Sequence, residues 1–255
     1  MRMHRWTILA AAGLLPFIFQ YSARSVPPEA FAHNKEAIKL YNAGKIKEAI
    51  VEFKKALTID PSNADYHNNL SQVYMSQNDL TNAVSEAEAA VKYRPADAKA
   101  QNILGSLLIK QNKLAEARKH FALSVKAAAK NSQYRLDLAN CLLADKKAAE
   151  AEKEYLEVLK ARPRDSLALS CLANALRAQK KLPEAETQAR QAIASAPGSA
   201  DAHLSLAGVL KDRCKDKEAI KEYETVLKLQ PAHSEAKAIK DQIDYLKNKA
   251  DTRIP

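Results

Sequence analysis

Alanine returns every 34 residues through most of this 255-residue chain, and this fixed step constrains the fold more than any other feature. The step is kept without a slip by Ala49, Ala83, Ala117, Ala151, Ala185 and Ala219. A second series holds Phe53, Ala87, Phe121, Tyr155, Ala189 and Tyr223, and the loop prolines are Pro61, Pro95, Pro163, Pro197 and Pro231. A period of this length is typical of a stacked array of one small unit. The spacing predicts six units without insertions, at 30–63, 64–97, 98–131, 132–165, 166–199 and 200–233.

Each unit contains two helical patterns separated by a short turn. In the second unit, apolar residues recur at helical spacing first around Leu70 and then around Ala87. Asn78 stands in the turn between them, where a left-handed residue is needed. Pro95 ends the second helix, and Asp97 is placed to cap the next one. Only five glycines and no alternating apolar run occur, so strands are not expected.

The repeated residues resemble the tetratricopeptide repeat. The resemblance rests on the alanine, aromatic and proline series, on Tyr74, and on Leu70, Leu104, Leu138, Leu172 and Leu206 followed by Ser71, Gly105, Ala139, Ala173 and Ala207. The early tryptophan of the family is absent, and His33, His67, Gln101, Arg135, Leu169 and His203 stand in its place. Its turn glycine is kept only as Gly44 and is replaced elsewhere by residues such as Lys146, Lys180 and Cys214. The resemblance implies an all-α, right-handed α-solenoid of six helix-turn-helix repeats.

A further helical pattern follows the sixth unit. Apolar residues step by three and four at Ala236, Ile239, Ile243, Leu246 and Ala250, with Lys and Asp between them. Such a helix covers the last repeat and presents a polar outer face, as solenoids need. We therefore expect a capping helix at 234–250 and a short tail at 251–255.

The first helices of such repeats line an inner groove, and the groove positions of the family can be carried over to this chain. Asparagine is frequent there, and an amide can donate to and accept from a peptide backbone. The alternative is that asparagine is simply tolerated on an exposed helix face. The predicted partner-binding residues are Asn34, Asn42, Asn68, Asn69, Gln72, Asn102, Ser106, Lys110, Asn140, Ser170, Asn174 and Arg177. The function predicted from them is a non-catalytic scaffold that binds a partner protein or an extended peptide.

An RNA-binding protein of the pentatricopeptide type is the alternative function. Its base-reading pairs would be Asn34/Asn63, Asn68/Asp97, Asn102/Asn131 and Ser170/Ser199. The net charge of +10 is compatible with it, but the basic residues are interleaved with acidic ones along the chain. Capping explains the residues at the unit ends equally well. No nucleic acid partner is therefore expected.

No catalytic, metal-binding or cofactor-binding motif emerges. The histidines His33, His67 and His203 share one repeat position, which indicates substitutions in the scaffold. No serine–histidine–aspartate order, phosphate loop or metal motif is present. The sequence thus predicts no catalytic residue, metal or cofactor. The spacing of Cys141, Cys171 and Cys214 is not that of metal ligands, and whether two of them form a disulfide stays open.

The first 23 residues read as a signal anchor or signal peptide, followed by a linker at 24–29. An uncharged run at 6–23, as a helix of ~27 Å, falls just short of a ~30 Å hydrocarbon core. Arg2 and Arg5 precede the run, which places the repeats on the non-cytoplasmic side of a membrane. A membrane-anchored bacterial envelope protein is expected, and a protein secreted after cleavage is the alternative. Ala30-Phe31-Ala32 matches a cleavage motif, but it also opens the first repeat.

Overall fold

The structure is a computed structural model that describes residues 26–251, and within them it contains thirteen α-helices and no strand. The first helices of the pairs are α1 (Pro28–Asn42), α3 (Ala64–Ser76), α5 (Ala98–Lys110), α7 (Ser132–Ala144), α9 (Ser166–Ala178) and α11 (Ala200–Asp212). The second helices are α2 (Ile46–Ile59), α4 (Leu80–Tyr93), α6 (Leu114–Ala127), α8 (Ala148–Ala161), α10 (Leu182–Ser195) and α12 (Asp216–Leu229), and α13 (Ala236–Asp251) follows them. The predicted all-α solenoid with a final capping helix is confirmed.

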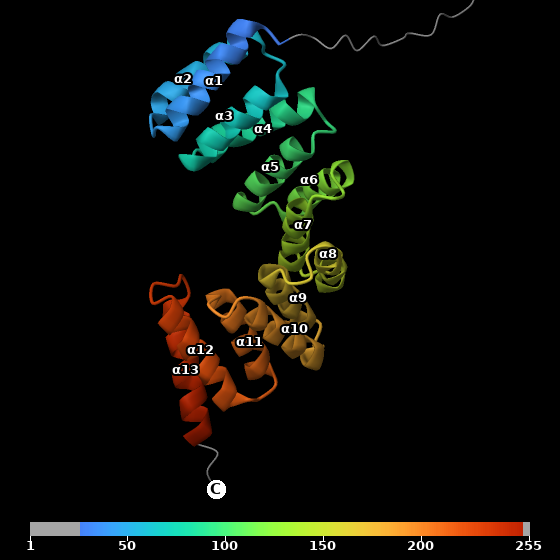
Figure 1. The fold of residues 1–255 in the computed structure, drawn as a ribbon, viewed down its shortest axis with the longest axis vertical. Coiled ribbons are helices and arrows are strands. Elements are labelled where there is room, and N and C mark those ends of the chain that lie inside the picture. Colours follow the sequence, from blue (N-terminus) through green and yellow to red (C-terminus); the bar gives the residue numbers. More distant parts are fainter. Residues whose placement is uncertain (1–25, 252–255) are drawn as a thin grey trace, which may run out of the picture.

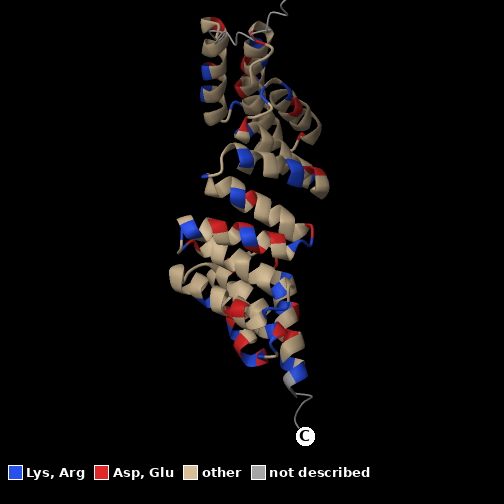
Figure 2. Ribbon diagram, turned by 90° about the vertical axis from the view of Figure 1, so that its right-hand side faces the viewer, with Lys and Arg blue, Asp and Glu red and all other residues tan. Residues whose placement is uncertain are grey.

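The helix pairs stack one after another along the long axis of the molecule (Figure 1). Each helix packs on its pair partner and on the next helix in the chain, while α3, α5, α7, α9 and α11 also contact one another in sequence. The first helices therefore form one continuous layer, and α13 covers α12 at the end of the stack. Lys and Arg are interleaved with Asp and Glu over the whole stack (Figure 2), so the excess positive charge is not gathered on one helix.

Fully buried small side chains set the distance between the two helices of each pair. All six alanines of the 34-residue series are 0% exposed. Small residues let helix axes approach closely, and the larger neighbours fill the space beside them. In the third pair, the Phe121 ring packs on Gly105 so closely that an added Cβ would lie 2.9 Å from it. The period in the sequence is therefore the period of these close contacts.

The turn inside each pair contains one left-handed residue. These residues are Gly44, Asn78, Asn112, Lys146, Lys180 and Cys214, with φ between 57° and 76°. The turn positions inferred from the sequence are thus confirmed, including Lys146, Lys180 and Cys214, whose side chains disfavour this backbone conformation.

A polar staple replaces the tryptophan of the family and joins three segments of the repeat. In the second pair, the His67 Nδ1 lies 2.6 Å from the Glu86 carboxylate on α4, and its Nε2 lies 3.0 Å from the Pro61 carbonyl. Burial alone would lower the pKa of His67, but the bonds to Glu86 and to Pro61 outweigh it and raise the pKa. Equivalent contacts join Gln101 to His120 and Pro95, Arg135 to Glu154 and Ala129, and His203 to Glu222 and Pro197. These contacts give the residues at this repeat position the structural role that the sequence predicted for its histidines.

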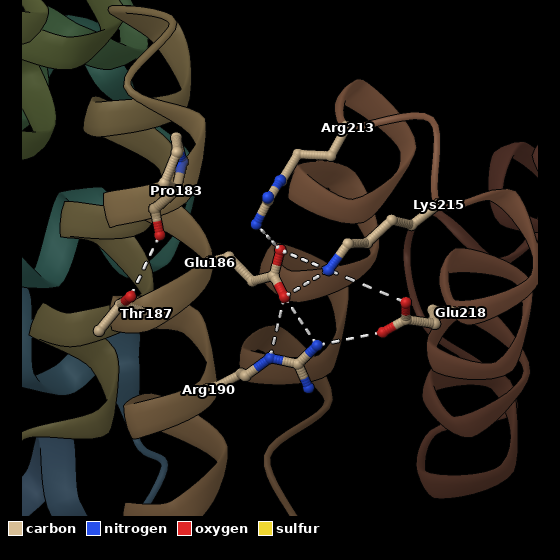
Figure 3. Close-up of polar contacts among 7 residues, drawn as sticks. All are labelled: Pro183, Glu186, Thr187, Arg190, Arg213, Lys215 and Glu218. Carbon is tan, nitrogen blue, oxygen red and sulfur yellow. Dashed lines mark hydrogen bonds and ion pairs between the residues drawn. The ribbon is translucent and has the colours of Figure 1, made fainter.

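A buried carboxylate holds the fifth pair to the sixth. Glu186 on α10, only 7% exposed, accepts hydrogen bonds from Arg190, Arg213 and Lys215 (Figure 3). Arg190 also bonds Glu218 at 3.1 Å. Burial acts to raise the pKa of Glu186, but the bonds from Arg190, Lys215 and Arg213 outweigh burial and lower the pKa to about 2.

Three boundaries differ from the sequence expectation. Helix α1 begins at Pro28, so the linker predicted at 24–29 loses its last two residues to the helix. Proline is favoured in the first turn because that turn needs no N–H donor. The last helix runs over Ala236–Asp251 instead of 234–250.

Three further points from the sequence concern the A-x-A motif, the cysteines and the apolar run near the N-terminus. Ala30, Phe31 and Ala32 lie inside α1, and Ala30 is fully buried. The three cysteines are free. No helix between residues 26 and 251 is long and apolar enough to cross a bilayer, and the apolar run at 6–23 lies outside this part.

We expect Glu186→Gln to lower the free energy of unfolding by about 2 kcal/mol at pH 7, since a buried acceptor of three charged donors loses its charge. The pKa of about 2 lies below the ordinary value of 4.5, so this stabilisation is present above pH 4.5 and is lost as the pH falls toward 2. Urea unfolding at pH 7, 5 and 3 measures it. The control is Glu224→Gln, which removes the exposed pair with Lys247 and should change stability by less than about 0.5 kcal/mol. Equal losses for both variants would contradict the prediction.

Candidate functional site

Two hollows open along the layer of first helices. The first has a volume of about 300 Å³ and lies between α5 and α7, with Ser106, Lys110 and Asn140 in its wall. The second, of about 490 Å³, lies between α9, α11 and α13, with Asn174 and Arg177 in its wall. Ser170 also lines the second hollow, so six of the predicted partner-binding residues line hollows on this inner face.

The residues predicted at the fifth position of each repeat mainly join neighbouring first helices. Asn34 and Ser170 are buried, and Asn102 is half-buried. The Asn69 amide donates to Asn34 Oδ1 at 3.0 Å, and the Asn102 amide donates to Asp137 Oδ2 at 2.8 Å. Both pairs are 35 residues apart, because the fifth position of one repeat faces the sixth position of the next. These side chains serve the contact between repeats.

Asn68 is an exception to this pairing. It is 0% exposed, and neither its Oδ1 nor its Nδ2 has a hydrogen-bond partner among the described residues. The sixth position of the next repeat, which supplies the polar partner elsewhere, holds Ile103 here. A buried amide without partners destabilises the folded state.

At the ninth position the side chains face the groove. Asn140 is exposed, and Asn174 is half-buried. Tyr155 Oη donates to Asn140 Oδ1 at 2.6 Å. The Ser205 hydroxyl shares its hydrogen between the Ser170 carbonyl at 3.1 Å and Asn174 Oδ1 at 3.3 Å. The carbonyl end of each amide is thereby held, while its NH₂ group has no partner among residues 26–251. The same position in earlier repeats holds Gln72 and Ser106, which bond carbonyls of their own helices.

The three remaining predicted residues stand near the ends of the first helices. Asn42 and Lys110 are exposed, and neither has an ion-pair or hydrogen-bond partner within the described chain. Arg177 is half-buried, and its Nε lies 3.7 Å from the Asp212 carboxylate.

Sequence reasoning missed five residues that shape the larger hollow: Asp201, Gly208, Lys211, Tyr223 and Glu235. A signal was present, because Lys211 and Arg177 are 34 residues apart and thus equivalent. No group of histidine, cysteine and acidic side chains suited to a metal occurs among residues 26–251.

The unit-end residues of the RNA-reading alternative are helix caps. The side chains of Asn63, Asp97, Asn131 and Ser199 accept hydrogen bonds from backbone N–H groups in the first turns of α3, α5, α7 and α11. Their identity follows from capping, so the pairing pattern gives no support to a nucleic acid code.

These features define an α-helical repeat protein with a polar inner groove. Three sequence profiles match the chain: one described as TPR repeat at residues 39–78, and two described as tetratricopeptide repeat at 74–132 and 176–243. The chain belongs to the tetratricopeptide repeat family. No curated protein matches it.

Solved structures with the same fold include PilF, PilW and YrrB. The chain is 20% identical to PilF of Pseudomonas aeruginosa, with a TM-score of 0.67 over 84% of this chain and 97% of that one. It is 18% identical to PilW, described as a type IV pilus biogenesis factor, with a TM-score of 0.72 over 84% and 99%. YrrB, described as a TPR protein with an unusual peptide-binding site, is 21% identical with a TM-score of 0.59 over 74% and 97%. At these identities the likeness shows the fold alone.

We expect Asn68→Leu to raise the free energy of unfolding by about 1–2 kcal/mol, because it removes a buried amide that has no partner. Leu136 and Leu204 stand at the equivalent position, so the repeat accommodates this side chain. Urea unfolding measures the change. The matched control is Asn34→Leu, which removes the acceptor of the Asn69 amide and should give no gain. A free energy of unfolding lower for Asn68→Leu than for the unchanged chain would contradict the prediction.

Proposed function

We propose that the protein is a non-catalytic scaffold that binds a partner protein, through an extended segment, in the groove formed by its first helices. One observation carries the proposal. Asn140 and Asn174 occupy equivalent positions in neighbouring repeats. A hydroxyl bonds the carbonyl end of each, from Tyr155 alone to Asn140 and from Ser205, shared with the Ser170 carbonyl, to Asn174, while the NH₂ donor has no partner among residues 26–251. Fixed amide donors in a row suit the carbonyl groups of a peptide backbone.

The fold relatives add support by analogy. YrrB, a protein of this fold, is described as having an unusual peptide-binding site. PilW, also of this fold, is described as a type IV pilus biogenesis factor. Fold alone does not carry function, so the groove residues have to be tested directly.

We expect photo-cross-linking groups placed at Ser106 and Asn140, inside the groove, to capture one partner in cells of the native host. Groups placed at Lys119 and Lys126, exposed residues of α6, should not capture it. Mass spectrometry of the cross-linked product identifies the partner and the peptide in contact. Capture from α6 alone, or equal capture from both sets, would place the binding surface elsewhere.

We further propose that residues 6–23 tether the repeats to a membrane on its non-cytoplasmic side, as in a bacterial envelope protein. The uncharged run between Arg5 and Arg24 and the arginines before it support this orientation. Cleavage after Ala32 would cut α1 and remove the buried Ala30 from the first repeat. The position of the A-x-A motif therefore favours retention of the leader.

We expect the purified mature protein to start at or near Met1 and to stay with membranes after alkaline carbonate washing. Protease added to intact spheroplasts should digest the repeats, because they face outward. N-terminal sequencing that returned Arg24 or His33, or repeats protected until lysis, would overturn the tether or its orientation.

A further inference from the structure

The larger hollow owes its form to the absence of one side chain. Gly208 stands on α11 at the position that holds Asn140 two repeats earlier. A Cβ at Gly208 would lie 1.8 Å from Nη1 of Arg177, so the guanidinium occupies the space that a side chain would fill. The hollow is closed on its far side by α13, and Lys211 donates to Gln242 of that helix at 3.0 Å.

The same glycine leaves the hydroxyl of a buried tyrosine without a protein partner. Tyr155 and Tyr223 are equivalent, and the Tyr155 hydroxyl donates to Asn140. Tyr223 is only 4% exposed and lines the hollow, and with glycine opposite it its hydroxyl has no hydrogen-bond partner among the described residues. Burial raises the pKa of Tyr223, although Arg177 acts to lower it, so the hydroxyl remains a donor at neutral pH. A hydroxyl that opens into a hollow and has no protein partner is available to donate to an acceptor on a bound molecule.

Charges of opposite sign lie at the two ends of this hollow. Asp201 begins α11 and Lys211 ends it, so ten residues of helix, about 15 Å, separate them. Glu235 lies beside the start of α13, and Arg177 lies at the end of α9. None of the four has an opposite charge closer than 3.7 Å among residues 26–251, which is the distance from Arg177 to Asp212. Lys211 bonds only the neutral Gln242, Glu235 has no cationic partner among residues 26–251, and Asp201 faces only His233 at 3.8 Å.

We infer that this hollow binds a dipolar segment of an extended peptide, with a carboxylate at Arg177, Lys211 and the Tyr223 hydroxyl and a cation at Asp201 and Glu235. An extended chain advances about 3.3 Å per residue, so side chains four residues apart span about 13 Å, close to the separation of the two ends. Arg177 is free to change partner, since its 3.7 Å pair with Asp212 is long and partly exposed. The inference rests on the proposed function and names the chemistry of the bound segment.

Five capped, fluorescein-labelled pentapeptides test it by fluorescence anisotropy with the full chain. Two are dipolar, Lys-Ser-Gly-Ser-Glu and its reverse, because the groove does not fix the direction of the chain. One is neutral, with Gln at both ends, and two carry Glu or Lys at both ends. We expect one of the dipolar peptides to bind about tenfold more tightly than the three peptides that are not dipolar, which is the size of one charge-assisted contact, and its binding to weaken with salt.

The decisive variant is Gly208→Ala. Its Cβ displaces the flexible end of Arg177, while alanine favours the helix, so the melting temperature should stay or rise as the preference for the dipolar peptide is lost. The control is Gly198→Ala, which meets nothing within 4 Å and should keep the preference.

The inference is overturned if the peptide with Glu at both ends binds as tightly as the preferred dipolar peptide, or if the preference survives Gly208→Ala. Failure of all five peptides also overturns it. If Ser106 and Asn140 still capture a partner in that case, the groove function stands and only the assignment of this hollow falls. If they capture none, the groove function falls as well.

Discussion

The close approach of two helices over a buried alanine is the contact on which the rest of this molecule depends. Each pair repeats it, and the six alanines are fully buried. A larger side chain there would push the two helices apart and leave gaps that neighbouring side chains could not fill, because protein interiors are packed without spare volume. The spacing of the pairs in turn sets which residues of successive first helices face one another. The groove is therefore a consequence of a contact on the opposite side of those helices.

The staple at the fourth position shows how the same geometry is kept with different chemistry. Where relatives carry tryptophan, this chain uses histidine, glutamine or arginine to bond both a loop carbonyl and a side chain of the second helix. Each of these side chains carries two polar atoms separated by about the width of an imidazole ring. Each can therefore bond both partners, so the three residue types are interchangeable here. The fifth repeat has Leu169 at this position, which makes no such contact and packs in an apolar cluster instead. The array tolerates this because neighbouring repeats support each other.

The sequence was sufficient for features that depend on residues close together in the chain. Asp97 caps α5 and Asn78 adopts the left-handed turn conformation as predicted, because both act on their own backbone. The fifth position was harder, since burial there is decided by a residue 35 positions later. Asn34 meets Asn69, whereas Asn68 meets the position of Ile103 and stays without a partner. The run of asparagines predicted one uniform surface, and the structure places some of them between helices and others, such as Asn140, on the groove.

Departures from the repeat carry more information about binding than the repeat itself. Residues that recur, such as the alanines and the caps, serve the stack and would be needed whatever the protein binds. Gly208 does not recur: equivalent positions hold Asn140 and Asn174, which give hydroxyls an acceptor. Without a side chain at Gly208, the Tyr223 hydroxyl has no acceptor there, the Arg177 guanidinium takes up the vacant space, and a hollow remains beside them. All three changes follow from the missing side chain at Gly208, which lies next to the capping helix. They make the C-terminal end of the groove chemically distinct from the rest.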